Sequence, residues 1–315
     1  MATGVPVKRI LVIKLGALGD VVQALGPMAA IRNHFKDAHI TVLTRPPFDT
    51  LITARGLADQ IIFDPKPAAV DVPGWLRLRK ILRDGGFDQV FDLQTSSRSS
   101  AYLHLFWPSK PIWSGIAAGC ALPHTNPNRD RMHTLERQAD QLHMAGIETV
   151  PAPSLDGIDS DISNLGLPPS FTMLVPGGGG NRPKKLWSAE NYHDIACRLD
   201  LGSAPAVVVG TEDERARAAE IIADAPNALN LAGKTSLLQL VGIAKAAKAA
   251  LGNDSGPMHV AAVAGTPSVV LYSEDSDPAL CAQRGADVTI LRRPSLDALS
   301  VDDVMQALPA ALGGS

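Results

Sequence analysis

Three glycine-containing stretches of this chain hold residues that could carry acid–base or phosphate chemistry. They are KLGALGD at 14–20, GGGGNRPKK at 177–185 and GNDSGPMH at 252–259. Each follows a short apolar run and leads toward a helical pattern. A glycine turn between a buried strand and a helix leaves the first amides of the helix exposed, which suits a phosphate-bearing ligand.

Asp20 lies where the first helical pattern begins, and two roles fit it. A carboxylate in the first turn of a helix complements the helix dipole and caps exposed amides. The same residue follows a buried strand, and in doubly wound sheets ligands bind beyond the carboxyl ends of the strands. Asp20 could therefore also remove a proton from a substrate hydroxyl. The sequence GALGD is not the GxGxxG of a dinucleotide site, and a carboxylate there would repel a bound diphosphate.

The stretch at 252–259 is typical of a phosphate site. Its DSGP sequence at 254–257 leads from a strand straight into a helix. Asp or Ser suits the cap, Pro needs no amide donor in the first turn, and the free amides attract a diphosphate. A well-capped turn without a ligand fits the same residues, and His259 could equally be a core histidine.

Two further groups of charged residues follow strands in the second half of the chain. After the glycine run at 177–180, an arginine and two lysines ending at Lys185 put positive charge where it could neutralise a leaving diphosphate. A flexible loop with solvated charges explains the same run. Glu212 and Glu214 begin a helix, where carboxylates either complement the dipole or hold the hydroxyls of a ribose.

The composition excludes several classes of protein. With 45% hydrophobic and 19% charged residues among 315, the chain is globular and long enough for two domains. The net charge of -3 and the 4% of aromatic residues argue against a nucleic-acid partner. Three distant cysteines and the lack of an apolar run of about 20 residues predict a reduced, cytoplasmic protein without a membrane span. The two DSD sequences lack further ligands, so we expect no metal site.

Apolar runs of strand length alternate with helical patterns in two series, on either side of a Pro-, Gly- and Ser-rich segment. Their continuous hydrophobicity is typical of parallel strands buried on both faces. We therefore predict an α/β protein with two Rossmann-like, doubly wound domains facing a cleft: residues 1–155, a linker at 156–167, and residues 168–315. The predicted strands are 9–14, 39–44, 60–63, 88–93, 111–116, 171–176, 205–210, 249–252, 267–272 and 287–292. The predicted helices are 21–35, 74–84, 97–106, 133–145, 188–199, 212–223, 235–247, 255–264 and 300–311, the last of which could pack back on the first domain.

One predicted helix, within 73–88, is both amphipathic and basic. Its apolar side suits a crossover helix that packs on a sheet and keeps a solvated outer face. Basic amphipathic helices also lie on anionic membranes, so peripheral contact with the inner face of a membrane is the alternative. The charged residues concerned are Arg77, Arg79, Lys80 and Arg83.

Together these motifs resemble glycosyltransferase family 9, the family of the ADP-heptose:lipopolysaccharide heptosyltransferases. The similarity spans nearly the whole chain. Its blocks are RILVIKLGALGDVVQALGPMAAIR, HTLERQADQL, KKLWSAENYHDIACRL and LGNDSGPMHVAAVAGTPSVVLY. Against the family's pattern, Ser255 replaces the commoner threonine but keeps its hydroxyl, and the run at 177–180 is unusually rich in glycine.

The resemblance implies a GT-B architecture that binds a nucleotide sugar mainly in the second domain and the acceptor mainly in the first. It implies an inverting transfer without metal or other cofactor. Asp20 would be the catalytic base and Lys185 would lie near the leaving diphosphate. Gly19, beside Asp20, and Arg98, whose charge would suit an anionic acceptor, are our candidates for acceptor contact. The residues that the resemblance implies for the donor are Glu212 (preferred for the ribose), Glu214, Thr235, Asp254, Ser255, Gly256 and His259. We add the glycines whose backbone a ligand could approach closely, Gly178, Gly179 and Gly180, and also Pro257, which follows Gly256 where the family's pattern differs.

We therefore expect a glycosyltransferase of lipopolysaccharide biosynthesis, with ADP-heptose as donor and a lipopolysaccharide core or another lipid-linked glycan as acceptor. An anionic, membrane-held acceptor would also give the basic residues of 73–88 a partner. One alternative is an NAD(P)-dependent Rossmann oxidoreductase, against which the missing GxGxxG counts. The other is a non-catalytic nucleotide-sugar-binding protein, against which the presence of Asp20 and Lys185 counts.

Overall fold

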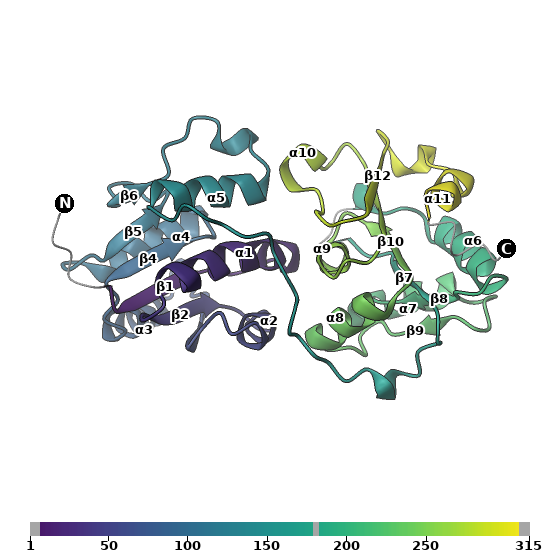
Figure 1. The fold of residues 1–315 in the computed structure, drawn as a ribbon, viewed down its shortest axis with the longest axis horizontal. Coiled ribbons are helices and arrows are strands. Elements are labelled where there is room, and N and C mark those ends of the chain that lie inside the picture. The colour runs from purple at the N-terminus through teal and green to yellow at the C-terminus, as the bar shows by residue number, and fades with distance from the viewer. Residues whose placement is uncertain (1–6, 179–182, 309–315) are drawn as a thin grey trace. The chain divides into compact units, whose positions relative to one another are not determined.

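The structure is a computed structural model that describes residues 7–178 and 183–308. The chain divides into two compact units, one up to Ser154 and one from Leu155 onward. Each unit is built on its own six-stranded parallel sheet with helices packed against it (Figure 1). The prediction of an α/β protein with two doubly wound parallel sheets is therefore confirmed.

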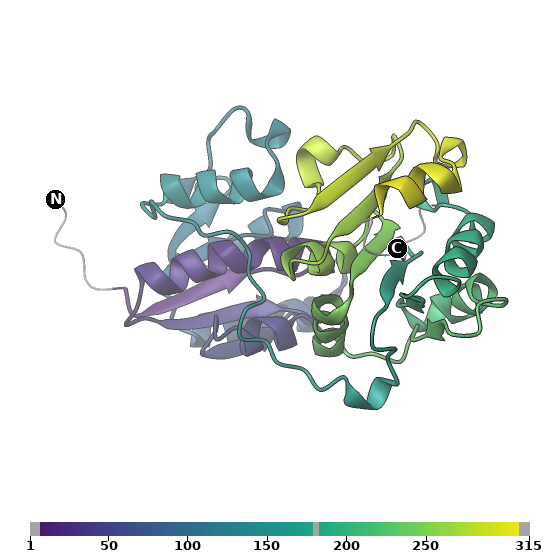
Figure 2. The same ribbon diagram turned by 45° about the vertical axis from the view of Figure 1, so that its right-hand side comes forward.

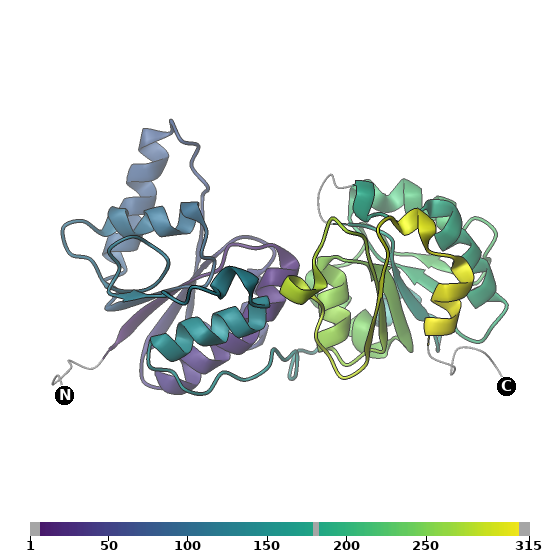
Figure 3. The same cartoon turned by 90° about the horizontal axis from the view of Figure 1, so that it is seen from above.

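The sheet of the first unit has the strand order β3-β2-β1-β4-β5-β6, so the chain reverses direction across the sheet between β1 and β4. The helices α1 and α5 pack side by side (Figure 2), and α3 stands out from the rest of the unit in Figure 3. The strands are β1 (Arg9–Ile13), β2 (His39–Thr44), β3 (Gln60–Phe63), β4 (Gln89–Asp92), β5 (Ile112–Gly115) and β6 (Leu122–Pro123). The helices are α1 (Leu18–His34), α2 (Asp49–Ala54), α3 (Val72–Asp84), α4 (Ser97–Ala101), which a 3-10 helix at Tyr102–Phe106 continues, and α5 (Thr134–Met144).

The second unit repeats this plan with the strand order β12-β11-β10-β7-β8-β9. Its strands are β7 (Thr172–Val175), β8 (Ala206–Val208), β9 (Leu229–Asn230), β10 (Ala249–Asn253), β11 (Ser268–Tyr272) and β12 (Val288–Arg292). Its helices are α6 (Ala189–Asp200), α7 (Arg215–Ile221), α8 (Leu237–Ala246), α9 (Gly256–Val263), α10 (Pro278–Cys281) and α11 (Val301–Ala307).

The apolar runs form strands because both faces of each sheet are covered. From Ile10 to Ile13 no residue of β1 is more than 1% exposed, and the central strands β7, β10 and β11 are buried throughout. Such strands read as continuous apolar runs, which is why their positions follow from the sequence. The helix α1 begins at Leu18, ahead of the predicted start at 21, and it continues through Pro27.

Two segments at the borders of the predicted second domain pack within the second unit. The segment 156–167, predicted to be a linker, packs on the second unit: Leu155 and Ile158 are 1% and 2% exposed, and Lys245 of α8 donates a hydrogen bond of 2.8 Å to the Ile158 carbonyl. The C-terminal helix α11 packs on α6, and Val304 joins the apolar core of the second unit. Contact of this helix with the first domain stays a prediction. Residues 309–311 of the predicted helix lie outside the described residues.

Candidate active site

The carboxyl edge of the second sheet brings the predicted donor residues together. Four neighbouring strands, β10, β7, β8 and β9, end at this edge, and each is followed by a loop that holds some of these residues. Gly179 and Gly180 lie outside the described residues. The described ones are Asp254, Ser255, Gly256, Pro257 and His259 after β10, Gly178 and Lys185 after β7, Glu212 and Glu214 after β8, and Thr235 after β9.

Lys185 and Asp254 form an ion pair at the centre of this edge. Lys185 Nζ lies 2.7 Å from Asp254 Oδ2, and the side chains are only 8% and 10% exposed. Ser276 joins the pair, since its hydroxyl donates to Asp254 Oδ2 at 2.6 Å and also accepts from the Lys185 ammonium. Burial by itself would raise the pKa of Asp254, but the hydrogen bonds from Lys185 and Ser276 outweigh burial and lower it below its ordinary value.

Tyr272 and Gln283 hold the second oxygen of the same carboxylate. The Tyr272 hydroxyl lies 3.0 Å from Asp254 Oδ1, and Gln283 Nε2 donates to that oxygen at 3.2 Å. Burial, followed by the charge of Asp254, raises the pKa of Tyr272, so its hydroxyl stays a donor. Nothing in the sequence marks Tyr272 or Gln283 as a site residue. Ser276 belongs to the second DSD sequence, at 275–277, which the sequence suggests only as a possible metal ligand.

The start of α9 leaves a buried hydroxyl without a partner. Ser255, next to Asp254, is the N-cap residue of α9, and Pro257 lies in the first turn. Ser255 is 9% exposed, and among the described residues its Oγ has no hydrogen-bond partner. A buried polar atom of this kind needs a partner, which a ligand at the helix start would supply. His259, one turn further, is 7% exposed.

Asn253 fixes the beginning of the glycine run from the strand beside it. Its side-chain amide donates to the Pro176 carbonyl at 2.7 Å, and its Oδ1 accepts from the Trp187 backbone N–H at 3.2 Å. The residue is fully buried at the end of β10. It therefore ties the segment entering Gly178 to the segment leaving Lys185, another role that the sequence did not reveal.

Glu212 and Glu214 have different surroundings. Glu214 Oε2 accepts the Thr211 backbone N–H at 2.7 Å, so this carboxylate caps the helical turn that leads into α7. Glu212 pairs with Arg215 at 2.8 Å and keeps its side chain 63% exposed. A Cβ added to Gly233 would lie 2.0 Å from Glu212 Oε2, so the carboxylate rests on the glycine turn that precedes Thr235. Glu212 is the carboxylate with room for a ligand.

In the first unit, Asp20 occupies the third position of α1 and is half-buried. Its Oδ2 accepts the Ala17 backbone N–H at 3.1 Å, which is one of the two predicted roles. The turn before it needs glycine: Gly16 has φ of +121°, and a Cβ there would lie 2.6 Å from the Phe48 ring. Gly19 is buried within the first turn of α1.

Two buried charged groups, Lys14 and Asp92, lie at the same edge of the first sheet. Lys14 is 3% exposed and donates to the Leu93 carbonyl at 3.2 Å. Burial lowers the pKa of Lys14, while the charges of Asp20 and Asp92 oppose that change. Burial raises the pKa of Asp92 to about 6, although its Oδ1 accepts the Thr95 backbone N–H at 3.0 Å.

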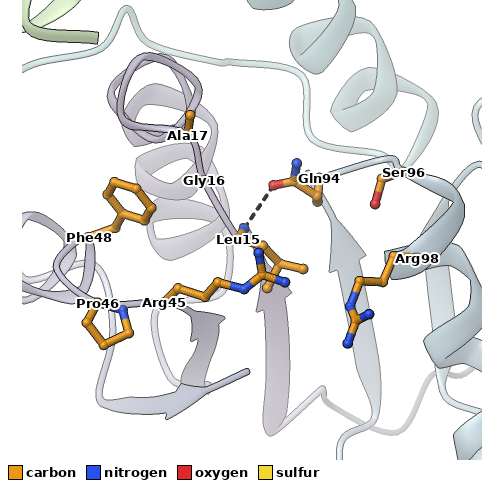
Figure 4. Close-up of a pocket in the computed structure, with 9 residues that line it drawn as sticks. All are labelled: Leu15, Gly16, Ala17, Arg45, Pro46, Phe48, Gln94, Ser96 and Arg98. Carbon is orange, nitrogen blue, oxygen red and sulfur yellow. Dashed lines mark hydrogen bonds between the residues drawn. The ribbon is translucent and has the colours of Figure 1, made fainter. Parts of the chain in front are cut away.

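A cavity of about 430 Å³ opens where the strand order of the first sheet reverses (Figure 4). Arg45 and Arg98 extend along it, and buried Asp64 lies 2.5 Å from the Arg45 guanidinium and 3.8 Å from that of Arg98. Gly16 and Ala17, just before Asp20, form another part of its wall. The lining residues are Leu15, Gly16, Ala17, Arg45, Pro46, Phe48, Gln94, Ser96 and Arg98, so the structure brings Arg98 to the cavity while Gly19 lies inside the helix.

Two features are absent from residues 7–178 and 183–308. No three His, Cys, Asp or Glu side chains in these ranges are grouped so that they could hold a metal ion. No helix in these ranges is long and apolar enough to cross a bilayer.

Residues 75–299 match the family model described as glycosyltransferase family 9 (heptosyltransferase). The chain belongs to this family. The lipopolysaccharide core heptosyltransferase OpsX of Haemophilus influenzae is 24% identical over 283 residues, which cover 84% of this chain and 79% of the relative. This membership confirms the prediction of a glycosyltransferase. It does not support the two alternatives, an NAD(P)-dependent oxidoreductase and a non-catalytic binding protein.

Solved structures agree in fold with this family 9 glycosyltransferase. The ADP-heptose lipopolysaccharide heptosyltransferase II of Escherichia coli has a TM-score of 0.80 at 21% identity and covers 96% of this chain and 98% of its own. The E. coli heptosyltransferase WaaC with ADP has a TM-score of 0.75 at 18% identity, with coverage of 95% and 98%. At such identities the likeness establishes the fold alone, which is the predicted GT-B type.

Proposed function

We propose that this glycosyltransferase moves heptose from ADP-heptose to a lipopolysaccharide core acceptor in a single inverting displacement. The observation that carries the donor assignment is the unpartnered, buried hydroxyl of Ser255 at the start of α9, next to the Lys185–Asp254 ion pair. Exposed helix amides, a hydroxyl and a fixed ammonium together suit a diphosphate. Two of the similar proteins are named with ADP-heptose or ADP, and these names support heptose as the sugar and adenine as the nucleobase of the donor.

The donor would lie along the carboxyl edge of the second sheet. Lys185 and the first amides of α9, from Gly256 onward, would stabilise the charge that develops on the leaving diphosphate. Because these groups supply positive charge, we propose that transfer proceeds without a metal ion. Glu212 would hold the ribose hydroxyls, with the adenine beyond it near Thr235. The backbone at Gly178, which bears no side chain, would approach the donor closely.

Asp20 would act as the general base on the acceptor hydroxyl. Its carboxylate accepts one backbone N–H, and a carboxylate has further lone pairs with which to accept a substrate proton. The cap and the base are therefore compatible roles for one side chain. A diphosphate leaves readily without protonation once its charge is neutralised, so one carboxylate suffices for a displacement that inverts the anomeric carbon.

The cavity of the first unit would hold the acceptor. Arg98 is kept in place by the Tyr102 hydroxyl at 2.8 Å and presents a guanidinium to the cavity, which suits an anionic sugar. The name of OpsX specifies a lipopolysaccharide core, which supports this class of acceptor. That the chain works in the cytoplasm stays a prediction.

Product analysis tests this proposal directly. The purified chain, supplied with ADP-heptose and a core oligosaccharide, should form a heptosylated product and ADP in the presence of EDTA. The new linkage should have the opposite anomeric configuration to the donor, as read by NMR. A parallel calorimetric comparison should show binding of ADP in preference to UDP, GDP, CMP and NAD. Binding of UDP or GDP alone would contradict the donor assignment, and a loss of transfer in EDTA would contradict metal independence.

A further inference from the structure

A segment of the first unit exposes apolar side chains that the fold does not use. Val70, in the loop before α3, is 89% exposed, and Val72 and Leu76 on the first turns of α3 are 62% and 58% exposed. We call these three residues the apolar tip. Figure 3 shows this loop and α3 standing out from the rest of the unit. Single exposed apolar residues are common, but several on one projecting segment indicate a contact surface.

The opposite side of α3 anchors the helix firmly. Leu78 and Leu82 are fully buried and pack in a core cluster with Tyr102 and Phe106 of the neighbouring 3-10 helix. With a period of 3.6 residues, Val72 and Leu76 share the face turned away from that core. The packing of α3 on the first unit therefore does not depend on the apolar tip. Exposure of the tip to water is unfavourable for the chain in isolation.

Basic residues continue the same exposed side of the helix. Arg77, Lys80 and Arg83 are exposed, and Lys80 follows Leu76 at a spacing that keeps both on one face. The acidic residues of this segment are engaged: Asp71 caps α3 by accepting the Gly74 backbone N–H at 2.9 Å, and Asp84 pairs with Lys80. The projecting segment thus carries an apolar end followed by positive charge.

Trp107 adds an amphipathic aromatic ring beside this helix. It follows the 3-10 helix, is 65% exposed, and its carbonyl accepts a hydrogen bond of 2.9 Å from Arg79 of α3. Tryptophan side chains favour the boundary between lipid head groups and acyl chains. Of the described tryptophans, Trp113 and Trp187 are fully buried.

We propose that the apolar tip, with Trp107 and the basic residues of α3, docks on the surface of an anionic lipid bilayer. The apolar side chains would enter the head-group region, and Arg77 and Arg83 would pair with lipid phosphates. Anionic lipid is the partner that complements both features at once, since an uncharged apolar partner would leave the charges of Arg77 and Arg83 without a counterpart.

The docking segment also connects to the cavity of the first unit. Arg98, which lines the cavity, donates to the Pro67 carbonyl at 3.2 Å, and its guanidinium lies 5.2 Å from the centre of the Trp75 ring. Pro67 and Trp75 belong to the loop and helix that carry the apolar tip. Docking would therefore present the cavity beside the lipid surface, a consequence that rests on the proposed lipopolysaccharide acceptor.

Vesicle sedimentation with the full chain tests the docking surface without any donor or acceptor. We expect the chain to sediment with vesicles of phosphatidylcholine and phosphatidylglycerol, and about tenfold less with phosphatidylcholine alone or in high salt. The Val70→Asp/Leu76→Asp and the Arg77→Glu/Arg83→Glu variants should each lose about tenfold in vesicle binding. The matched control is Leu201→Asp, an exchange at a 90% exposed leucine of the second unit, which should bind as the parent chain does. Parent tryptophan emission should shift to shorter wavelength on vesicles, and Trp107→Phe should abolish the shift.

Three results would overturn the docking proposal. They are no preference for anionic vesicles, unchanged binding by the tip variant, and a dimer in light scattering that the tip variant dissociates, which would make the surface a protein interface. Failure of the proposed function would look different. Transfer to a soluble core oligosaccharide should be equal in the parent chain and the Val70→Asp/Leu76→Asp variant. Its absence in both would contradict the proposed reaction and leave the vesicle result standing.

Discussion

The ammonium of Lys185 lies 2.7 Å from the carboxylate of Asp254, although 69 residues separate the two in the chain. Lys185 follows β7 and Asp254 follows β10, and these strands are neighbours in the second sheet. The pair is largely buried, so each charge depends on the other for compensation. The ammonium is thereby held at the start of α9, where the proposed diphosphate would bind.

Replacing the lysine should separate catalysis from stability. Lys185→Met removes the proposed charge on the leaving diphosphate, and we expect the transfer rate to fall by about 10²–10³-fold. It also leaves Asp254 without its buried partner, which should cost about 3 kcal/mol in free energy of unfolding. The double variant Lys185→Met/Asp254→Asn is the matched control. It should recover most of the stability, measured by urea denaturation, without recovering the rate. Equal recovery of both would mean that Lys185 is only structural.

Ser276 and Tyr272 should act as positioning residues for the same pair. Ser276→Ala and Tyr272→Phe each remove one hydrogen bond to Asp254, and we expect kcat to fall about tenfold with a smaller change in the donor KM. Ser276→Thr keeps the hydroxyl and should restore most of the rate. The control Ser268→Ala removes a buried hydroxyl at the other end of β11, where it donates to the Thr266 carbonyl at 2.7 Å. Losses of kcat in the control as large as in the test variants would argue against positioning.

Much of this arrangement follows from the sequence because of strand burial. Long apolar runs such as β1 and β10 are covered on both faces, and the residues after them were expected at one edge of each sheet. Short elements left no periodic signal: α2 has six residues, α10 has four and β6 has two. A helical period needs about ten residues before it can be recognised, and a strand pattern needs about four.

The supporting side chains could not be predicted in the same way. Asn253, Tyr272 and Gln283 act through contacts with residues distant in sequence, and nothing local marks a buried amide or phenol as a hydrogen-bond partner. The segment at 156–167 has the composition of a linker, yet Ile158 is buried and Ile162 packs on α8, where a Cβ added to Gly242 would lie 2.7 Å from its side chain. The roles of these residues depend on tertiary contacts, which local composition does not predict.

Asp92 should make stability depend on pH in a defined direction. Its native pKa is about 6, above the value of 3.8 for a solvated carboxyl, so the folded chain binds the proton more tightly. The free energy of unfolding should therefore fall as pH rises from about 3 to about 7, by on the order of 3 kcal/mol for this group. Asp92→Asn removes this titration, and its stability relative to the parent chain should grow across that range in urea denaturation. A difference that stays constant with pH would contradict the raised pKa.

Gly16 should tolerate no side chain. Its φ of +121° is costly for an L-residue, and a Cβ would lie 2.6 Å from the Phe48 ring. We expect Gly16→Ala to lower the free energy of unfolding by about 1–3 kcal/mol. Gly56→Ala is the matched control, because that glycine also has positive φ, +63°, but no atom within 4 Å of the added Cβ. Equal losses in the two variants would show that backbone strain, and not contact with Phe48, accounts for the effect.

The transfer rate of Asp20→Asn is the most direct test of the proposed reaction. Asparagine can still accept the Ala17 backbone N–H through its side-chain oxygen, so the cap of α1 and the stability of the chain should be retained. It cannot accept the proton of an acceptor hydroxyl, and we expect kcat with ADP-heptose and core oligosaccharide to fall by about 10²–10⁴-fold. A folded Asp20→Asn chain that transfers heptose at the parent rate would contradict Asp20 as the base.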